Sequence, residues 1–388
     1  MDTHIIRALR PQLTPETPAM TELRHEVRAF LRERIEAGAF LPGVDTWLTK
    51  WDASFTTELA RRGFVGMTIP EKYGGHGRSH LERFVVVEEL LAHGAPVAAQ
   101  WVADRQIAPS LLRFGSEEQK MRYLPGIAAG EVSFGIGMSE PDSGSDLASV
   151  RTTAKRVAGG WSLSGTKVWT SGAHESDAFF ALARSAPRDP DNRHAGLSQF
   201  IVDLRSPGVE IRPIISMAGA HHFNEVHLDG VFVPDDMVLG TIGDGWRQVT
   251  SELGFERSGP ERFLSSFVLF ATMLELTRTG RLDVDTAELG RIAARLTSLH
   301  HASLAVAGAL QRGDDADTAA AIVKVLGTAL EKWIVELADL CAGPAARQDN
   351  RFEPLLVAGL RQRAGFTLRG GTNEILKVSI AKGMGAGR

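Results

Sequence analysis

The sequence predicts an α+β protein of several domains, because the spacing of its apolar residues changes twice along the chain. From about 21 to 130 apolar residues recur at helical spacing, from 132 to about 240 they alternate as in strands, and after 245 long helical runs return. A chain of 388 residues is also longer than one hydrophobic core usually serves. We therefore expect two or three domains in the order helices, strands, helices.

The first helical region carries recognisable start and stop signals. Apolar residues at Leu23, Val27 and Phe30 mark one helix face. Ser116 followed by Gln119 predicts a capping box at a helix start, and Gly130 predicts a helix stop.

The middle region predicts antiparallel strands separated by turns, and the last region predicts long helices. Strands are expected over 132–137, 150–157, 161–168, 178–183, 198–204 and 209–215. After them, Asp285 with Glu288 predicts a helix start, and an apolar run over 322–337 is expected to stop at Gly343-Pro344.

Composition favours a small-molecule partner. Lys and Arg total 43 against 47 Asp and Glu, a formal charge of −4, which argues against a nucleic-acid or anionic-membrane surface. No apolar run approaches the roughly 18 residues of a membrane helix, and the start lacks a signal-peptide core, so we expect a cytoplasmic protein. Cys341 is the only cysteine, so an intrachain disulfide or a cysteine metal cluster is excluded, and we expect no metal site.

Two polar, glycine-containing runs stand out in the middle region, 138–146 (MSEPDSGSD) and 165–172 (GTKVWTSG). Each lies at the end of a predicted strand, so hydroxyls and backbone N–H groups should gather at neighbouring strand ends. Such groups suit a flat polar ring or a phosphate, although the same residue types also form ordinary turns. No G-x-G-x-x-G follows a strand and opens a helix, so any nucleotide would bind on the β-region and not in a Rossmann site.

Taken together and in this order, the two runs resemble the TEP-x-x-GSD and WIT-type segments of the acyl-CoA dehydrogenase family. Further landmarks in family order are Gly74-Gly75, Glu256-Arg257 and the stretch 370–375 (GGTNEI). The resemblance implies an N-terminal helical domain (1–131), a middle antiparallel β-barrel or sandwich domain (132–241) and a C-terminal four-helix-bundle domain (242–388). It also implies FAD as cofactor, an acyl-CoA thioester as substrate, an electron-transfer flavoprotein as electron acceptor, and a homotetramer.

The family's reaction needs a carboxylate base to remove the α-proton while a hydride passes to flavin N5. In many members the base is the glutamate of a YEGT-like sequence, but Gly370 stands at that place here. The family's second location, found in the isovaleryl-CoA and long-chain branch, is matched by Glu256 before Arg257, so we assign the base to Glu256 and expect burial to raise its pKa. Glu261 is a lower-ranked rival carboxylate, and Pro260 predicts a kink if the helix continues. By the same analogy the backbone N–H of Gly370 donates to the thioester carbonyl.

The remaining site residues come from the same resemblance. Met138 and Ser139 are expected on the pyrimidine side of the flavin, with Trp169 and Thr170 flanking the ring and Thr170 near N5. Two further groups complete the prediction: Gly371 and Thr372 for the cofactor, and Ser145, Arg257, Trp101 and Arg105 for the substrate.

Some features depart from the family pattern and keep other functions open. The R-x-x-F-G and Q-x-x-G-G-x-G segments that hold FAD across a subunit boundary have no clear counterparts. The loop expected after Gly219 carries His221 and His222, which suggests either a CoA phosphate contact or ordinary surface histidines. The alternatives are a dehydrogenase for carrier-protein-bound acyl groups, a flavin oxidase or monooxygenase, and a non-catalytic partner subunit of a mixed tetramer.

Overall fold

The computed structural model describes residues 11–256 and 259–386, with the side chains of 252–256 left outside the description. The chain forms two compact units, each built from separate stretches of sequence. The first unit consists of Met1–Lys50, Ser79–Pro96 and Glu256–Arg388, and the second of Trp51–Arg78 and Val97–Phe255. The three-domain division in chain order, 1–131, 132–241 and 242–388, stays a prediction.

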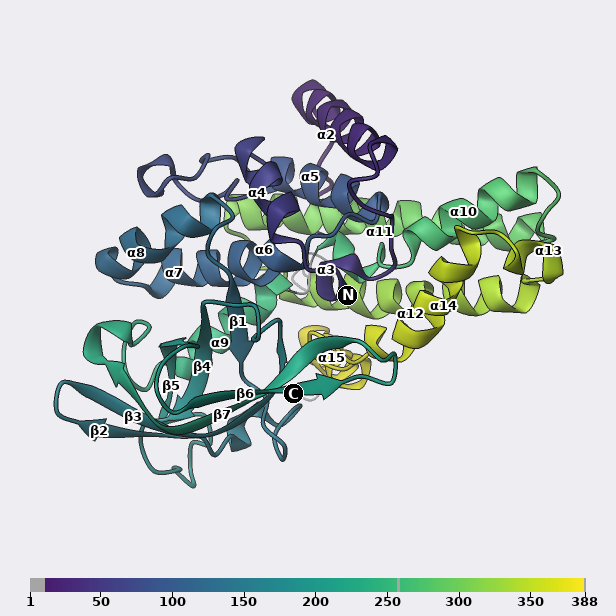
Figure 1. Ribbon diagram of the computed structural model, residues 1–388. Helices are drawn as coiled ribbons and strands as arrows, with labels where there is room; N and C mark the ends of the chain where they lie inside the picture. Colours follow the sequence, from purple (N-terminus) through teal and green to yellow (C-terminus); the bar gives the residue numbers. More distant parts are fainter. Residues whose placement is uncertain (1–10, 257–258, 387–388) are drawn as a thin grey trace. The chain divides into compact units, whose positions relative to one another are not determined.

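One curled sheet dominates the second unit (Figure 1). Its strands are β1 (Phe134–Gly137), β2 (Thr153–Val157), β3 (Gly160–Ser171), β4 (Ala178–Arg184), β5 (Leu197–Asp203), β6 (Val209–Ile215) and β7 (His221–Pro234). Their order in the sheet is β1-β4-β2-β3-β7-β6, and β5 pairs with β4. The long pairings β2–β3, β3–β7, β4–β5 and β6–β7 are antiparallel as expected, whereas β1 runs parallel to β4.

Short helices belong to the same unit as the sheet. They are α4 (Ala53–Arg61), α6 (Ala98–Val102), the π-turn η2 (Ala103–Ile107), α7 (Ala108–Phe114), α8 (Glu117–Ala128) and α9 (Gly245–Glu256). Ser116 and Gln119 form the predicted capping box at the start of α8, and Gly130 takes φ +71° just beyond its end. The core of this unit joins Ile107 and Leu124 of the helices to Phe134 and Phe180 of the strands.

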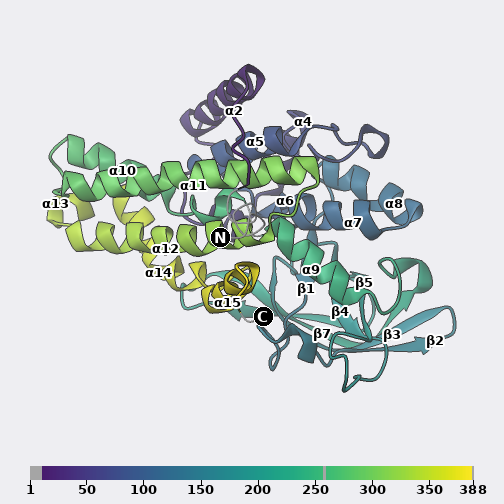
Figure 2. The same cartoon turned by 180° about the vertical axis from the view of Figure 1, so that it is seen from behind.

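The first unit is helical (Figure 2). Its helices are α2 (Pro18–Glu36), α3 (Thr46–Thr49), α5 (His80–Ala92), α10 (Phe267–Arg278), α11 (Thr286–Arg312), α12 (Asp317–Cys341), α13 (Pro344–Arg347), α14 (Phe352–Phe366) and α15 (Asn373–Gly383). α12 packs against α10, α11, α14 and α15, and α5 packs against α2 and α11. Asp285 caps α11 by accepting from the Ala287 N–H at 2.9 Å, and α12 ends just before Gly343-Pro344, as the sequence predicts.

One local expectation about the region around the β-sheet was wrong, and one condition was not met. The stretch that begins at His221 is not a loop, because it is the start of β7 and pairs with both β3 and β6. The kink that Pro260 would cause in a continuing helix does not arise there, because Gly259 is extended and Pro260 opens the short 3-10 turn η5 (Pro260–Arg262).

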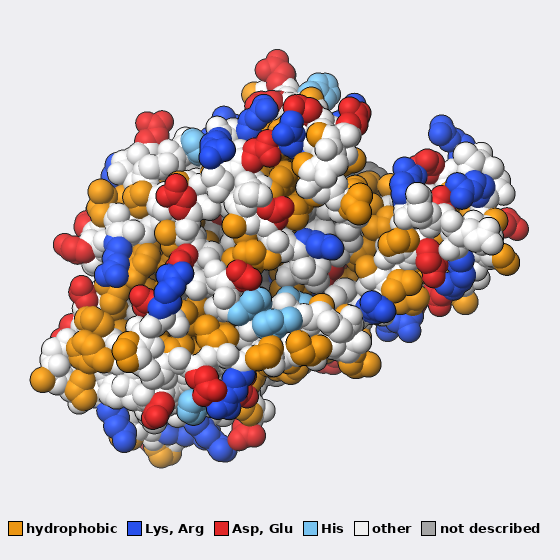
Figure 3. Space-filling model, in the orientation of Figure 1, with side chains coloured by type: hydrophobic (Ala, Val, Ile, Leu, Met, Phe, Trp, Pro, Cys, Tyr) orange, Lys and Arg blue, Asp and Glu red, His pale blue; other side chains and the backbone are white. Residues whose placement is uncertain are grey.

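The surface agrees with the balanced composition. On the face drawn in Figure 3, acidic and basic side chains are interspersed, with no broad area of one sign. Among the described residues, no helix combines the length and apolar character that crossing a membrane would require.

Candidate active site

A buried ion pair joins the two polar runs predicted from the sequence. Lys167 is fully buried, and its ammonium donates to Glu140 Oε1 at 2.8 Å and to the carbonyl of Met138 at 3.1 Å. Glu140 also accepts backbone N–H groups from Arg151 and Thr152 at 2.6 and 2.9 Å. Hydrogen bonds between the two sequence motifs therefore hold the 138–146 run, which follows β1, against β3.

Burial and the neighbouring groups shift the pKa values of both partners. Burial lowers the pKa of Lys167 to about 8. Burial alone would raise the pKa of Glu140, but Lys167 and the backbone donors together hold that pKa below its ordinary value. Sequence analysis missed both residues, since the partners are distant in sequence and each reads alone as an ordinary surface charge.

Backbone geometry brings Met138-Ser139 beside Trp169-Thr170. The Val168 N–H donates to the Ser139 carbonyl at 2.9 Å, so the two predicted flavin-binding segments are neighbours. The ladder between β3 and β7 is irregular between Lys167 and Thr170, and Trp169 takes φ +62°. Positive φ is costly for a large side chain, and such bulges often redirect side chains at functional sites.

The bulge leaves two adjacent side chains with opposite environments. The Trp169 side chain is 57% exposed and meets Phe223 edge-on, with ring centroids 5.6 Å apart. Thr170 is fully buried, and its Oγ1 has no hydrogen-bond partner among the residues that the structure describes. Gly135 lets β1 approach this side chain, because a Cβ at Gly135 would lie 3.1 Å from the Thr170 Cγ2.

These features fit a flat ring with polar edges. A buried hydroxyl without a partner costs free energy unless a ligand supplies one, and an exposed indole offers a flat apolar face. A flavin provides both a ring to cover the indole and edge nitrogens and oxygens to pair with the hydroxyl. The residues present therefore fit the cofactor that the resemblance implies, and the individual roles of Met138, Ser139, Trp169 and Thr170 stay predictions.

The rest of the first polar run forms an exposed turn. Ser145 is exposed, and its contact with the pantetheine arm of CoA stays a prediction. Its neighbours are fixed internally, because Ser143 and Ser149 both donate to the Asp146 carbonyl, at 2.8 and 2.7 Å. A shallow hollow lies beside this turn, lined in part by Glu140, Thr152 and Gly165.

Trp101 and Arg105, predicted to contact substrate, lie inside the second unit. Both are buried, and the Arg105 guanidinium stacks 4.8 Å from the Trp101 ring centroid. The neighbouring Asp104 accepts the Gly66 N–H at 2.9 Å. The contacts seen for this helical turn are internal, so its role toward substrate stays a prediction.

The candidate base lies at the end of a helix. Glu256 is the last residue of α9, and its side chain and Arg257 lie outside the described residues. Its rival Glu261 is 1% exposed and sits in η5, where Oε1 lies 3.8 Å from the Arg262 Nε. The assignment of the base to Glu256 and its raised pKa stay predictions.

The C-terminal glycine motif forms the turn between α14 and α15. Gly370 and Gly371 take φ +65° and +85°, and Thr372 caps α15 by accepting the Ile375 N–H at 3.3 Å. The buried Lys324 of α12 donates to the Gly371 carbonyl at 2.8 Å and to the Asn373 Oδ1 at 2.7 Å. The structure thus shows a turn held by hydrogen bonds from Lys324 and Thr372, while the contribution of its residues to cofactor and thioester binding stays a prediction.

Beside this turn lies a buried charged group that sequence analysis missed. Arg369 donates to both carboxylate oxygens of the buried Asp45, at 3.0 and 2.9 Å, and stacks on the Trp47 ring. Nearby, Glu331 accepts the Ser265 N–H at 2.7 Å. Burial raises the pKa of Glu331 to about 8, so this carboxyl is mainly protonated at neutral pH.

Comparisons with known proteins identify the family of this chain. Residues 17–131 match the family model "Acyl-CoA dehydrogenase, N-terminal domain", and residues 135–231 match "Acyl-CoA dehydrogenase, middle domain". Two relatives come from Mycobacterium tuberculosis (strain ATCC 25618 / H37Rv). Acyl-CoA dehydrogenase FadE29 is 36% identical and covers 83% of this chain and 85% of the relative, and acyl-CoA dehydrogenase IpdE1 is 34% identical and covers 93% and 96%.

A solved structure described as the Tcur3481-Tcur3483 steroid ACAD is 28% identical, with a TM-score of 0.81, and covers 96% of this chain and 99% of its own. The fold, with its sheet and its helical unit, and the matched sequence relatives thus indicate the same family. This chain belongs to the acyl-CoA dehydrogenase family and is an oxidoreductase acting on acyl-CoA thioesters.

Proposed function

We propose that this enzyme catalyses FAD-dependent α,β-dehydrogenation of an acyl-CoA thioester to the 2,3-enoyl-CoA, with Glu256 as the α-proton base. The observation that carries the proposal is the end of β3, where the buried Thr170 hydroxyl has no partner among the described residues beside the exposed, positive-φ Trp169. Both features suit the edge and face of a flavin.

Each residue has one task in the proposed reaction. Glu256 takes the α-proton, and the Gly370 N–H donates to the thioester carbonyl as negative charge develops on its oxygen. Thr170 and Trp169 hold the ring, with Met138 and Ser139 at its pyrimidine side. FAD, when bound, supplies the acceptor for the hydride that leaves the β-carbon.

We propose a bulky, ring-containing acyl group as the substrate class. One support is the similarity of this chain, at 28% identity, to the solved structure described as a steroid ACAD. The other is the proposed position of the base, Glu256 on the internal helix with a glycine at position 370, which is compatible with bulky acyl groups. An electron-transfer flavoprotein is the proposed electron acceptor and a homotetramer the proposed assembly.

A second candidate is a partner subunit of a mixed assembly. The description of the steroid ACAD names two components, and the FAD-holding segments of the C-terminal region have no clear counterparts in this chain. In this case the chain would hold FAD only together with another subunit. A substrate linked to an acyl carrier protein is a further alternative, which acyl-CoA titration distinguishes.

The test is an anaerobic titration of the purified chain with straight, branched, aromatic and steroid-derived acyl-CoAs. Bleaching of the flavin absorbance by one class is expected, and Glu256→Gln should abolish it while leaving the bound flavin spectrum in place. Glu261→Gln is the matched control, since it neutralises the rival carboxylate on the adjacent 3-10 turn and should preserve bleaching.

The opposite pattern, bleaching lost in Glu261→Gln and kept in Glu256→Gln, would reassign the base. A yellow protein that no acyl-CoA bleaches would favour a carrier-protein substrate. A colourless protein that binds FAD only after mixing with a second subunit would favour the partner-subunit role.

A further inference from the structure

Asn224 lies directly opposite Thr170 across the β3–β7 pairing, and it is fully buried. Its amide nitrogen donates to the Thr170 backbone carbonyl at 3.1 Å. The same nitrogen lies 3.0 Å from His174 Nδ1, and its amide oxygen lies 2.8 Å from His221 Nε2. One amide group therefore connects Thr170 to two histidines, and no sequence motif predicts this connection.

The Thr170 carbonyl determines which way the Asn224 amide points. A carbonyl oxygen can only accept, so the group facing it must be the NH₂ and not the amide oxygen. The second hydrogen of that NH₂ then points at His174, whose Nδ1 must accept it. The remaining amide oxygen accepts from His221, whose Nε2 must carry a proton.

This pattern assigns opposite hydrogen-bond roles to the two rings, because His174 accepts at Nδ1 and His221 donates at Nε2. The rings are stacked, with centroids 3.9 Å apart and planes 20° from parallel. Partial burial of the ring and the neighbouring His221 lower the pKa of His174, against the opposing effects of Glu175 and of the Asn224 hydrogen bond.

The network also reaches from the surface to the buried hydroxyl. Both histidines are exposed, whereas Asn224 and Thr170 are buried. Histidine side chains also gather at the surface on the face shown in Figure 3. The β3–β7 ladder is irregular between Lys167 and Thr170, so backbone pairing constrains the Thr170 end of β3 less than a regular ladder would. The side-chain hydrogen bond from Asn224 to the Thr170 carbonyl adds a constraint at this place.

We propose that Asn224 is a positioning residue for Thr170 at the cofactor-binding end of β3, and that His174 and His221 hold its amide in the orientation this role requires. The inference rests on the proposed function, because the hydroxyl being positioned is the one assigned to FAD. Asn224 touches neither reacting atoms nor cofactor in this scheme and acts through Thr170.

The test compares Asn224→Asp with the parent. The variant has nearly the same shape but no N–H donor, so an oxygen faces the Thr170 carbonyl. We expect FAD affinity, measured by quenching of flavin fluorescence on adding apoprotein, to fall on the order of tenfold, together with a changed visible spectrum of the bound flavin. The effect should shrink in a Thr170→Val background if Asn224 acts through Thr170.

Two further variants keep the test informative. His174→Phe keeps a stacked ring on the surface but removes the acceptor for Asn224, and should weaken FAD binding roughly threefold. His227→Gln is the matched control, since it breaks the Thr166–His227 contact at 3.0 Å on the same two strands and should leave FAD binding unchanged. Nitrogen NMR shifts of the apoprotein should show His174 without a proton on Nδ1 and His221 with one on Nε2.

The results separate this inference from the proposed function. A parent protein that takes up no FAD overturns the proposed function and the inference with it. A parent that binds FAD, with Asn224→Asp unchanged or with His227→Gln equally weakened, overturns only the role of Asn224. A proton found on His174 Nδ1 at neutral pH overturns the amide orientation on which that role depends.

Discussion

Lys167 and Glu140 form a buried ion pair between the two sequence motifs of the candidate site. Exposed pairs contribute little to stability, but a buried pair that loses one partner leaves the other charge uncompensated. The pair also holds the Met138 carbonyl and two backbone N–H groups, so its loss would disturb the run that contains Ser139. The pair therefore stabilises this part of the structure through its buried hydrogen bonds, and not through the weak attraction of a solvent-exposed ion pair.

We predict that Lys167→Met lowers the free energy of unfolding by about 3–5 kcal/mol, because Glu140 would keep a buried charge without its cation. The double variant Glu140→Gln/Lys167→Met should recover part of that loss. Urea unfolding followed by circular dichroism measures both. A single variant within about 0.5 kcal/mol of the parent, the usual range for surface changes, would contradict the prediction.

At the same scale, the sequence motifs predicted two segments that the structure places side by side, but not the hydrogen bonds that join them. Ser139, Trp169 and Thr170 belong to recognisable motifs, and the structure brings their segments together through the bond between Val168 and Ser139. Asn224 and Lys167 were not predicted as positioning residues, because their partners become neighbours only when β3 and β7 pair. Local patterns do not encode such tertiary hydrogen bonds.

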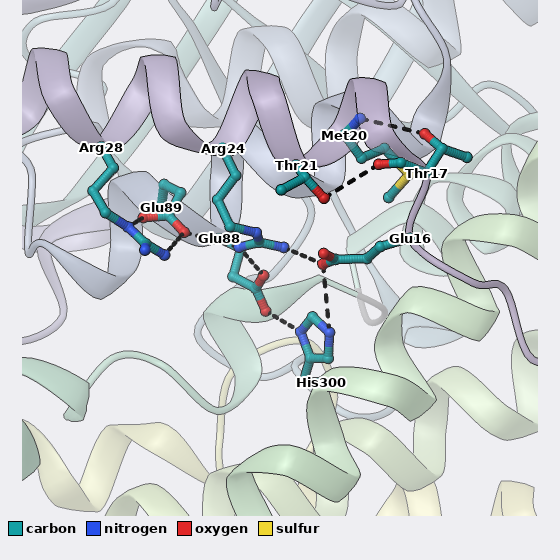
Figure 4. A network of polar contacts seen from close by, with 9 residues as sticks. All are labelled: Glu16, Thr17, Met20, Thr21, Arg24, Arg28, Glu88, Glu89 and His300. Carbon is teal, nitrogen blue, oxygen red and sulfur yellow. Dashed lines mark hydrogen bonds and ion pairs between the residues drawn. The ribbon is translucent and has the colours of Figure 1, made fainter.

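Among the elements of the first unit, α2, α5 and α11 are joined by a charged network (Figure 4). Arg24 of α2 donates to Glu88 and Glu89 of α5 at 2.7 and 2.8 Å, and to Glu16 at 2.5 Å. His300 of α11 completes it with a 2.5 Å contact from Nδ1 to Glu88. Two carboxylates and a histidine lie close enough to hold a metal ion, but the Arg24 guanidinium already bridges the carboxylates, so the group is better described as an ion-pair network.

This network predicts a pH dependence at the level of helix packing. The hydrogen bond and charge of Glu88 raise the pKa of His300 above its ordinary value of 6.5, against the effect of burial. A raised folded-state pKa means that the stabilisation is fully present below 6.5 and is lost as the pH rises through the folded-state pKa. As the pH rises from 6.5 through the folded-state pKa of His300, we expect the free energy of unfolding to fall by about 1 kcal/mol in the parent. The His300→Gln variant should not show this fall.

The measurement is a series of urea unfolding curves across that pH range. His301→Gln is the matched control, because His301 is the next residue on α11 and is exposed, so its replacement should leave the pH dependence intact. A pH dependence that persists unchanged in His300→Gln would assign the effect to other groups.

Secondary-structure prediction was correct where the apolar spacing and the capping residues gave a clear signal, and it was wrong at the start of one strand. The capping box of α8 and the end of α12 follow local signals that need no tertiary information. The start of β7 was read as a loop because His221, His222 and Asn224 are polar and follow a glycine. Pairing with strands on both sides stabilises β7 in spite of that composition, as tertiary context often overrides propensity.

For the whole molecule, the compact units do not follow chain order. The sheet shares its core with helices that precede it, since Ile69, Ile107, Leu111 and Leu124 are buried with Phe134 and the other strand residues. The sequence pattern could place the boundary between helices and strands, but not which helices bury the sheet. That choice depends on side-chain packing between elements far apart in the chain.

This shared core predicts that the strand region cannot fold alone. A fragment of residues 132–241 would expose the apolar face that Ile107, Leu111 and Leu124 cover, and burial of each such side chain contributes about 1.5–3 kcal/mol. Three of them together contribute about 4.5–9 kcal/mol, which is comparable with the lower part of the roughly 5–15 kcal/mol that stabilises a typical domain. We therefore expect the fragment to lack cooperative urea unfolding and dispersed NMR shifts, whereas residues 51–255, which contain the whole core, should show both. Cooperative unfolding of 132–241 by itself would mean that the strands form their own core and that the preceding helices only dock on it.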